Sequence, residues 1–266
     1  MEKVYKKNIP DKPGIKSSFI VLTILDLFGI MVIIIVNSIS LLPVLYLGTT
    51  IYKNNSTPII LSILIPSGFL FYLITYVFVN AAFKWIIAGR LKCGNFDIHD
   101  LAVFKWFRTV LFTIDNQGFL FSNIKFFRIL RYLYFWLLGA KIHYRGLLPN
   151  NFHCYEPELI TIGDSTIIGS DAFLTCHVLS GNKREFKIAP IYIGEHCLIG
   201  AGAHILAGTT INNSVTIGIA SIIGTNAKIG EHSIILNRSY VKSNQVIPDN
   251  EVWAGIPAKK IGVVSQ

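Results

Sequence analysis

Charged residues are scarce in the first part of this 266-residue chain. Between Lys16 and Lys53 the only charged residue is Asp26, and between Lys53 and Lys84 there is none. In the whole chain 15% of the residues are charged and 52% are hydrophobic. This composition excludes a disordered chain and a highly charged water-soluble protein. We therefore expect part of the chain to lie in lipid.

Cysteine is also sparse, and its spacing excludes two kinds of scaffold. The four cysteines are Cys93, Cys154, Cys176 and Cys197, and they form no CxxC pair and no zinc-site spacing. We expect neither a disulfide framework nor a metal site. Free thiols in a reducing, cytosolic setting fit this pattern.

The two runs with little charge are each long enough to cross a bilayer once. About 20 apolar residues span the hydrocarbon core, so we predict two transmembrane helices at roughly 18–42 and 58–83. Pro43 is expected to end or kink the first helix and Pro66 to kink the second. Asp26 inside the first run is either a functional residue or a polar group that snorkels to the membrane interface or hydrogen-bonds to the second helix.

Most of the net charge of +9 belongs to the apolar half of the chain. Residues 1–140 contain 14 Lys and Arg against 6 Asp and Glu, whereas residues 141–266 contain 10 against 9. Basic residues flank the two runs, and the loop between the runs contains only Lys53. The positive-inside rule then places both ends in the cytoplasm, as in a two-pass protein of the inner or plasma membrane. A membrane surface, and not nucleic acid, is the expected partner of these charges.

Aromatic and basic residues alternate between positions 101 and 138. Lys125, Arg128 and Arg131 recur every third residue, which would place them on one stripe of a helix. We expect amphipathic helices that lie in the headgroup plane of the membrane. The alternative is that the aromatic rings pack against the base of the domain that follows.

An internal repeat dominates the second half of the chain. Aliphatic residues occur every six positions, and Trp253 continues the series after Ile193, Ile199, Ile205, Ile211, Ile217, Ile223, Ile229, Ile235, Val241 and Ile247. Such a period fits neither a helix nor an alternating strand. It predicts a short strand and a turn repeated around a prism, with the aliphatic side chains stacked in a central column.

One insertion interrupts the repeat. Ile162, Ile168 and Leu174 have the same spacing as the later set, but Leu174 and Ile193 are nineteen residues apart, one more than three repeats. The polar segment 180–187 lies between them and is predicted to be a loop that leaves the solenoid. Loops on rigid scaffolds often carry functional sites.

These motifs together resemble the hexapeptide-repeat acyltransferases. The resemblance rests on the hexads, the loop after Cys176 and His177, the run 193–203 and the Pro-Ala-Lys ending at 257–259. It covers residues 141–266 and implies a mainly β chain with a left-handed parallel β-helix at its C-terminal end. The segments 89–94, 131–142 and 158–164 resemble, more narrowly, the membrane-embedded terminal domains of nonribosomal peptide synthetases of the poly-lysine synthetase type.

The chain is thus expected to have four parts. These are a basic cytoplasmic tail (1–17), a transmembrane hairpin (18–88), juxtamembrane amphipathic helices (89–140) and the hexapeptide-repeat domain (141–266). The resemblance implies transfer of an acyl group, usually acetyl, from coenzyme A to a hydroxyl or amine, without a metal and commonly within a homotrimer. An acyl-carrier thioester is the alternative donor.

Two functions from different classes remain open. One is an acyltransferase whose acceptor is a lipid-linked sugar, a peptide or another small molecule near the membrane. The other is a non-catalytic β-helix scaffold that positions intermediates of a peptide or polysaccharide assembly system.

A histidine is the expected general base, because the ordinary pKa of a histidine side chain lies near 6.5. His177 matches the catalytic histidine of the resembled family and stands directly before the inserted loop, whereas His196 and His204 are expected to be turn or wall residues. The base needs an acceptor on its other ring nitrogen. Glu185 is favoured for this role over Asp171, although the sequence does not decide.

The resemblance also suggests contacts with coenzyme A. Small residues at a coil edge allow a ligand to approach the backbone closely, although tight coils need small residues in any case. The candidates are Gly202, Ala203, Ala220 and Ser221 for the edge, and Lys242 and Lys259 for the phosphates. Trp253 is expected to cap the column of aliphatic side chains, with stacking on adenine as the alternative.

Overall fold

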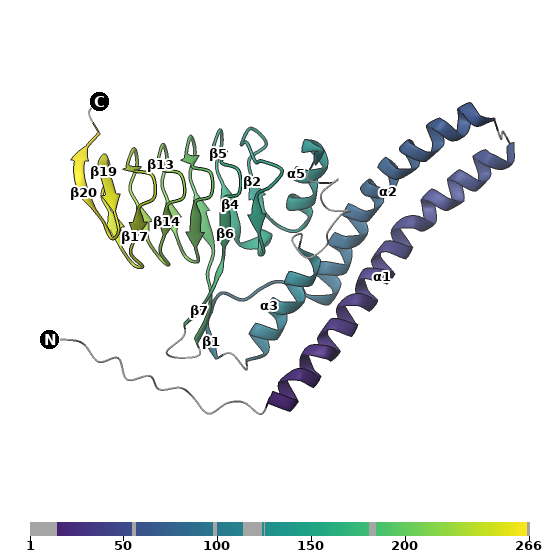
Figure 1. Ribbon diagram of the computed structural model, residues 1–266, viewed down its shortest axis with the longest axis horizontal. Coiled ribbons are helices and arrows are strands. Elements are labelled where there is room, and N and C mark those ends of the chain that lie inside the picture. Colours follow the sequence, from purple (N-terminus) through teal and green to yellow (C-terminus); the bar gives the residue numbers. More distant parts are fainter. Residues whose placement is uncertain are drawn as a thin grey trace.

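The computed structural model describes residues 15–54, 57–97, 100–113, 124, 126–180 and 185–264, and the side chains from residue 27 onward within these ranges, except that of residue 54. Two long helices form a hairpin, and a β-solenoid of about six turns follows at one end of it (Figure 1). The fold class expected from the repeat is confirmed. The basic tail up to residue 14 and the side chain of Asp26 lie outside the described residues.

The hairpin consists of α1 (Ile15–Asn54) and α2 (Pro58–Ile87). Each contains a stretch long and apolar enough to cross a membrane, Leu27–Lys53 in α1 and Pro58–Ile87 in α2. Helix α1 is longer than expected because it continues through Pro43. Close to this proline, Thr75 of α2 donates a hydrogen bond to the backbone carbonyl of Ser40 (2.8 Å), the kind of contact from a neighbouring helix that makes proline tolerable in a spanning segment.

Buried polar contacts attach α2 to the rest of the chain. The Lys84 ammonium lies 2.9 Å from Oε1 of Glu158, and the two side chains are 1% and 7% exposed. The Trp85 indole donates to the carbonyl of Leu137 (2.7 Å). The sequence interpretation counted Lys84 among the basic residues that flank the second helix. In the structure this lysine is buried, because the acidic residue at the start of the solenoid is its partner.

Among the described residues, the shorter helices α3 (Leu101–Phe112) and α5 (Arg128–Leu137) follow α2. Of the expected basic stripe, Arg128 is exposed, Arg131 is only 8% exposed, and Lys125 lies outside the described residues. Tyr132, Tyr134 and Phe135 of α5 are buried in the same core cluster as the solenoid. The alternative interpretation therefore holds for α5, because its rings pack against the base of the solenoid.

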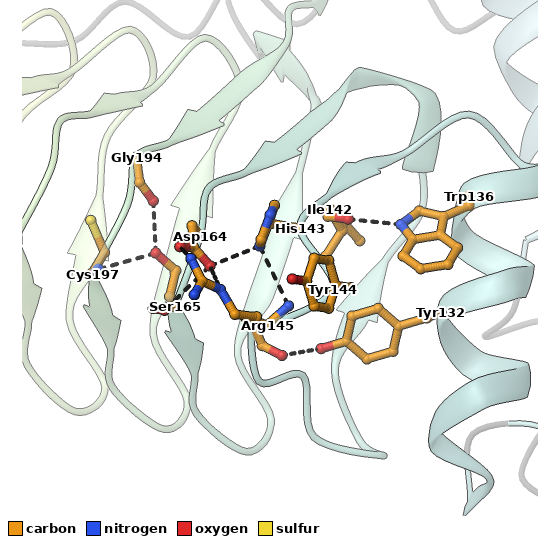
Figure 2. A network of polar contacts seen from close by, with 12 residues as sticks. Tyr132, Trp136, Ile142, His143, Tyr144, Arg145, Asp164, Ser165, Gly194 and Cys197 are labelled. Carbon is orange, nitrogen blue, oxygen red and sulfur yellow. Dashed lines mark hydrogen bonds and ion pairs between the residues drawn. The ribbon is translucent and has the colours of Figure 1, made fainter.

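The joint between α5 and the first coil contains a polar network (Figure 2). The Trp136 indole donates to the carbonyl of Ile142 (2.7 Å). In the next coil Asp164 accepts a hydrogen bond from Arg145 of the first coil (Nε to Oδ1, 2.8 Å) and lies 2.8 Å from Nδ1 of His143. The Arg145 guanidinium is the main cause that lowers the pKa of the Asp164 carboxyl from its ordinary value. The Trp136 bond joins α5 to the first coil, and the Asp164 contacts join the first coil to the second.

The solenoid has three parallel sheets, one on each face of the prism. The first contains β2 (Lys141–Ile142), β4 (Ile160–Ile162), β9 (Ile191–Ile193), β12 (Thr210–Ile211), β15 (Lys228–Ile229) and β18 (Val246–Ile247). The second contains β5 (Ile167–Ile168), β10 (Leu198–Ile199), β13 (Thr216–Ile217), β16 (Ile234–Ile235) and β19 (Glu251–Gly255), with β20 (Ala258–Val263) antiparallel to β19. The third contains β3 (His153–Cys154), β6 (Phe173–Thr175), β11 (His204–Leu206), β14 (Ile222–Ile223) and β17 (Tyr240–Val241). A short 3-10 helix, Pro157–Leu159, precedes β4.

The six-residue period produces this core directly. All ten aliphatic residues of the series from Ile193 to Ile247 are at most 1% exposed. Three positions after each of them the backbone adopts a left-handed conformation, from His196 (φ 54°) to Asn250 (φ 59°), which turns the chain at each corner of the prism. Trp253 is partly buried and packs against the end of the column, as expected of a cap.

The insertion is present, but its described part is a β-hairpin and not a loop. Strands β7 (His177–Ser180) and β8 (Glu185–Ile188) pair antiparallel, and β1 (Gly94–Asp97) adds to β8 from the segment after α2. Residues 181–184 at the tip lie outside the described residues. This three-stranded sheet projects from the solenoid beside α3 (Figure 1).

Candidate functional site

His177 lies where the chain leaves the solenoid. It has the same place in its hexad as His196, but it begins strand β7, whereas His196 is an exposed residue in a left-handed turn. The inserted hairpin replaces the corner turn at this coil. The His177 side chain is consequently 23% exposed and is held against the solenoid.

The imidazole of His177 is paired with a buried carboxylate. Its Nδ1 lies 2.6 Å from Oε1 of Glu156, whose side chain is fully buried. Two donors hold that carboxylate in place: the Trp106 indole N–H donates to Oε1 (2.5 Å) and the backbone N–H of Cys176 donates to Oε2 (3.0 Å). With Nδ1–H directed at the carboxylate, Nε2 keeps a free lone pair and can accept a proton.

Three parts of the chain meet at this pair. Trp106 comes from α3, Glu156 from the coil before the hairpin, and His177 from the hairpin itself. The Trp106 ring also contacts the imidazole, with ring centroids 4.4 Å apart, and Phe186 of β8 contacts both rings, at 5.6 Å from the imidazole and 4.8 Å from the indole. The histidine ring is therefore fixed by packing as well as by its hydrogen bond.

A groove of about 580 Å³ opens beside the imidazole. Its lining is almost entirely apolar or aromatic and consists of Val103, Trp106, Tyr155, Phe173, Thr175, His177, Val178, Leu179, Phe186 and Leu206. Its volume lies in the range of small-molecule sites. The groove provides space for a reacting molecule next to His177.

The structure corrects the interpretation of Glu185. Across the hairpin His177 pairs with Ile188 and Ser180 pairs with Glu185, so that Glu185 lies three residue pairs away from the histidine. The expected contact on Nδ1 is made by Glu156 instead. Asp171 is exposed at the corner before β6, on the opposite edge of the sheet from His177, with its nearest ion-pair contact at His153 (3.9 Å).

Glu156 was missed because the early coils do not repeat every eighteen residues. Strand β3 pairs with β6 so that Cys154 lies beside Leu174, an offset of twenty residues. Glu156 therefore comes next to Cys176 and His177. A search for acidic residues one coil upstream of the histidine, with this longer offset allowed, would have found it.

The residues proposed to bind coenzyme A do not form one site with His177 within a single chain. Gly202 and Ala220 occupy left-handed corners before β11 and β14, whereas His177 follows β6, on the other edge of the same sheet. Ala203 and Ser221 are fully buried inside the prism, so their side chains cannot touch a ligand. The backbone N–H groups of both are hydrogen-bonded within the coil.

The two lysines and the other histidines lie at scattered positions. Lys242 is exposed at the corner after β17, on the same edge as His177, and Lys259 is exposed on β20 at the far end of the solenoid. His204 is exposed on β11, with its ring 5.5 Å from that of Phe173. Of these residues, only Lys242 keeps a position that suits a ligand reaching His177.

The thiol next to His177 does not suit the role of reactive group. Cys176 is fully buried, and burial together with the nearby Glu156 charge raises the pKa of its thiol well above the ordinary value. A protonated, inaccessible thiol is a poor nucleophile. Among the described residues no group of three or more His, Cys, Asp or Glu could hold a metal ion.

Comparisons with known proteins give limited information. No family model matches the sequence, and no curated protein matches it.

Several solved structures are similar to part of the chain. A hexapeptide-repeat acetyltransferase of Vibrio cholerae is 24% identical over 55% of this chain and 89% of its own length, with a TM-score of 0.44. The structure of such a V. cholerae protein with acetyl coenzyme A is 21% identical over 64% and 93%, with a TM-score of 0.47. An N-acyltransferase from Bacillus cereus, in complex with dTDP and 3-hydroxybutyryl-CoA, is 17% identical over 47% and 79%, with a TM-score of 0.35. Because the identities are below 25% and the TM-scores below 0.5, the function has to be inferred from the residues of the site.

Proposed function

We propose that this protein is a membrane-tethered acyltransferase with His177 as its general base. The observation that carries the proposal is the Glu156–His177 pair, held by Trp106 and opening on a groove. Burying a carboxylate is costly unless it is paired and hydrogen-bonded, and such arrangements are concentrated at functional sites. A buried pair can be structural, as Lys84 and Glu158 are, but the groove beside His177 favours catalysis over a non-catalytic scaffold. The narrower likeness to terminal domains of nonribosomal peptide synthetases stays a prediction.

The chemistry is a single acyl transfer. The acceptor hydroxyl or amine attacks the thioester carbonyl and gives its proton to Nε2 of His177. The tetrahedral intermediate then collapses, the C–S bond breaks, and the imidazolium returns the proton to the leaving thiolate. Glu156 stabilises the imidazolium in between and keeps the ring oriented through Nδ1. The products are the acylated acceptor and the free thiol.

The donor is acetyl coenzyme A or another acyl coenzyme A, with an acyl-carrier thioester as the alternative. Lys242 suits the phosphates because it lies on the same solenoid edge as His177. Gly202 and Ala220 lie on the opposite edge, so a donor that touches them and His177 has to lie between two copies of the chain. A homotrimer in which neighbouring copies complete each site would satisfy this requirement.

Thioester turnover tests the proposed activity. Purified protein in lipid nanodiscs is mixed with acetyl coenzyme A and a set of alcohols and amines, and the released thiol is measured. We expect thiol release that depends on the acceptor and yields an equal amount of acylated product. Absence of turnover with acetyl, longer acyl and carrier-protein thioesters alike would reject the proposed activity.

The membrane arrangement is a second part of the proposal. The two apolar helices support a two-pass hairpin in the inner or plasma membrane, and the solenoid at its basic end would be cytoplasmic. An epitope tag inserted after Asn54, at the tip of the hairpin, should be reached by antibody or protease from outside intact cells. A tag that is protected until the cells are lysed would contradict this orientation.

A further inference from the structure

We infer that the acceptor is an amphiphile whose apolar part lies in the groove along α3, with its hydroxyl or amine at Nε2 of His177. The inference rests on the proposed function and adds the class of acceptor. Three observations support it: the chemistry of the groove lining, the attachment of α3 to the hairpin, and the exposed apolar residues on α3.

The lining of the groove suits a hydrocarbon or an aromatic body. Among the described residues that line it there is no Lys, Arg, Asp or Glu, and the Thr175 hydroxyl is already within 3.0 Å of Nδ1 of His177. A sugar nucleotide would need charged or donor groups along its length, since polar groups lose free energy when they are buried without partners. An alkyl chain gains free energy from the same surface.

Helix α3 connects this groove to the membrane helices. Val103 and Trp106 of α3 form one wall of the groove. At its other end, the Phe112 carbonyl accepts a hydrogen bond from Asn80 of α2 (3.1 Å). The wall of the site is therefore built on the base of the hairpin, and α3 lies beside that base in Figure 1.

Helix α3 also has exposed apolar residues on its other side. Leu101 is 78% exposed and Phe104 is 44% exposed, and the helical period places both opposite Val103 and Trp106. Exposed apolar residues next to spanning helices are typical of contact with lipid. Helix α3 would then have one side on the membrane surface and the other on the groove, and the water-soluble donor would approach from the solenoid corner that carries Lys242.

Matched acceptors with one headgroup and two chain lengths test the inference. Alcohol and amine acceptors carrying a methyl or a dodecyl chain are compared in nanodiscs with acetyl coenzyme A. We expect the KM of the dodecyl member to be lower by roughly tenfold or more, because several methylene groups are buried. Equal KM values for the two members would overturn the inference and leave the proposed acyl transfer intact.

A groove variant separates this effect from a general defect. Leu179 is 52% exposed at the groove, so Leu179→Asp should fold. It should raise the KM of the dodecyl acceptor by a much larger factor than that of the methyl acceptor. The matched control is Leu198→Asp, a 45% exposed leucine on β10 that does not line the groove, which should behave as wild type. If Leu179→Asp alters only the KM of long-chain acyl coenzyme A, the groove holds the donor chain and the inference is wrong.

Binding can be measured without turnover. A dodecyl acceptor brominated on its chain should quench the fluorescence of Trp106, whose ring lines the groove. The Trp106→Phe variant identifies that part of the signal, since it removes the indole and keeps an aromatic ring. Quenching that is the same in both proteins would show that the chain does not enter the groove.

Discussion

Replacing His177 with alanine is expected to lower kcat for acyl transfer about a thousandfold, within the usual range for loss of a general base. The reason is the single proton transfer that the imidazole performs at Nε2. The Glu156 carboxylate cannot take over, because it is fully buried and already accepts two hydrogen bonds from other donors. KM values should change little, since the groove walls remain. The measurement is steady-state thiol release in nanodiscs.

His196→Ala is the matched control for this experiment. His196 occupies the same hexad position as His177, but it is an exposed turn residue outside the groove. Its removal should leave turnover at the wild-type level. Full activity in His177→Ala, with every acceptor that wild type uses, would contradict the proposed mechanism.

Replacing Lys84 with methionine is expected to cost about 3–5 kcal/mol of stability, the usual loss when one member of a buried ion pair is removed. The Glu158 carboxylate would remain, 7% exposed, without the ammonium that lies 2.9 Å from it. The Lys84 ammonium also donates to the carbonyl of Gly89 (3.1 Å). Unfolding of purified protein in detergent, followed by circular dichroism, measures the loss.

Two further variants sharpen this prediction. The double variant Lys84→Met with Glu158→Gln should recover much of the loss, because no unpaired charge remains buried. Lys92→Met is the control, since Lys92 is exposed in the segment after α2. Equal stability of Lys84→Met and wild type would show that the pair does not hold the helices to the solenoid.

The regular part of the fold could be predicted because its contacts repeat at a fixed sequence distance. A period of six places each aliphatic residue beside the residue eighteen positions away, as Ile199 and Ile217 are in β10 and β13. The column, the corner turns and the place of the insertion all follow from that rule. The apolar hairpin could be predicted for a similar reason, because a long segment without charge has few alternatives to lipid or a core.

The site could be predicted only in part. His177 was found from its place before the insertion, but Glu156 and Trp106 were not, because both contacts depend on tertiary structure. Glu156 is displaced by the irregular offset of the early coils, and Trp106 arrives on a helix whose packing no local pattern specifies. The burial of Lys84 and Arg131 was missed likewise, since long basic side chains are usually exposed.

The measurement that tests the central claim most directly compares two glutamate variants in the thiol-release assay. Glu156→Gln keeps the shape of the side chain at Nδ1 of His177 but removes the charge that stabilises the imidazolium, so kcat should fall by about a hundredfold or more. Glu185→Gln changes a residue three strand pairs away and should retain the wild-type kcat. A loss of activity in Glu185→Gln together with full activity in Glu156→Gln would contradict the assignment of the Glu156–His177 pair as the base of an acyltransferase.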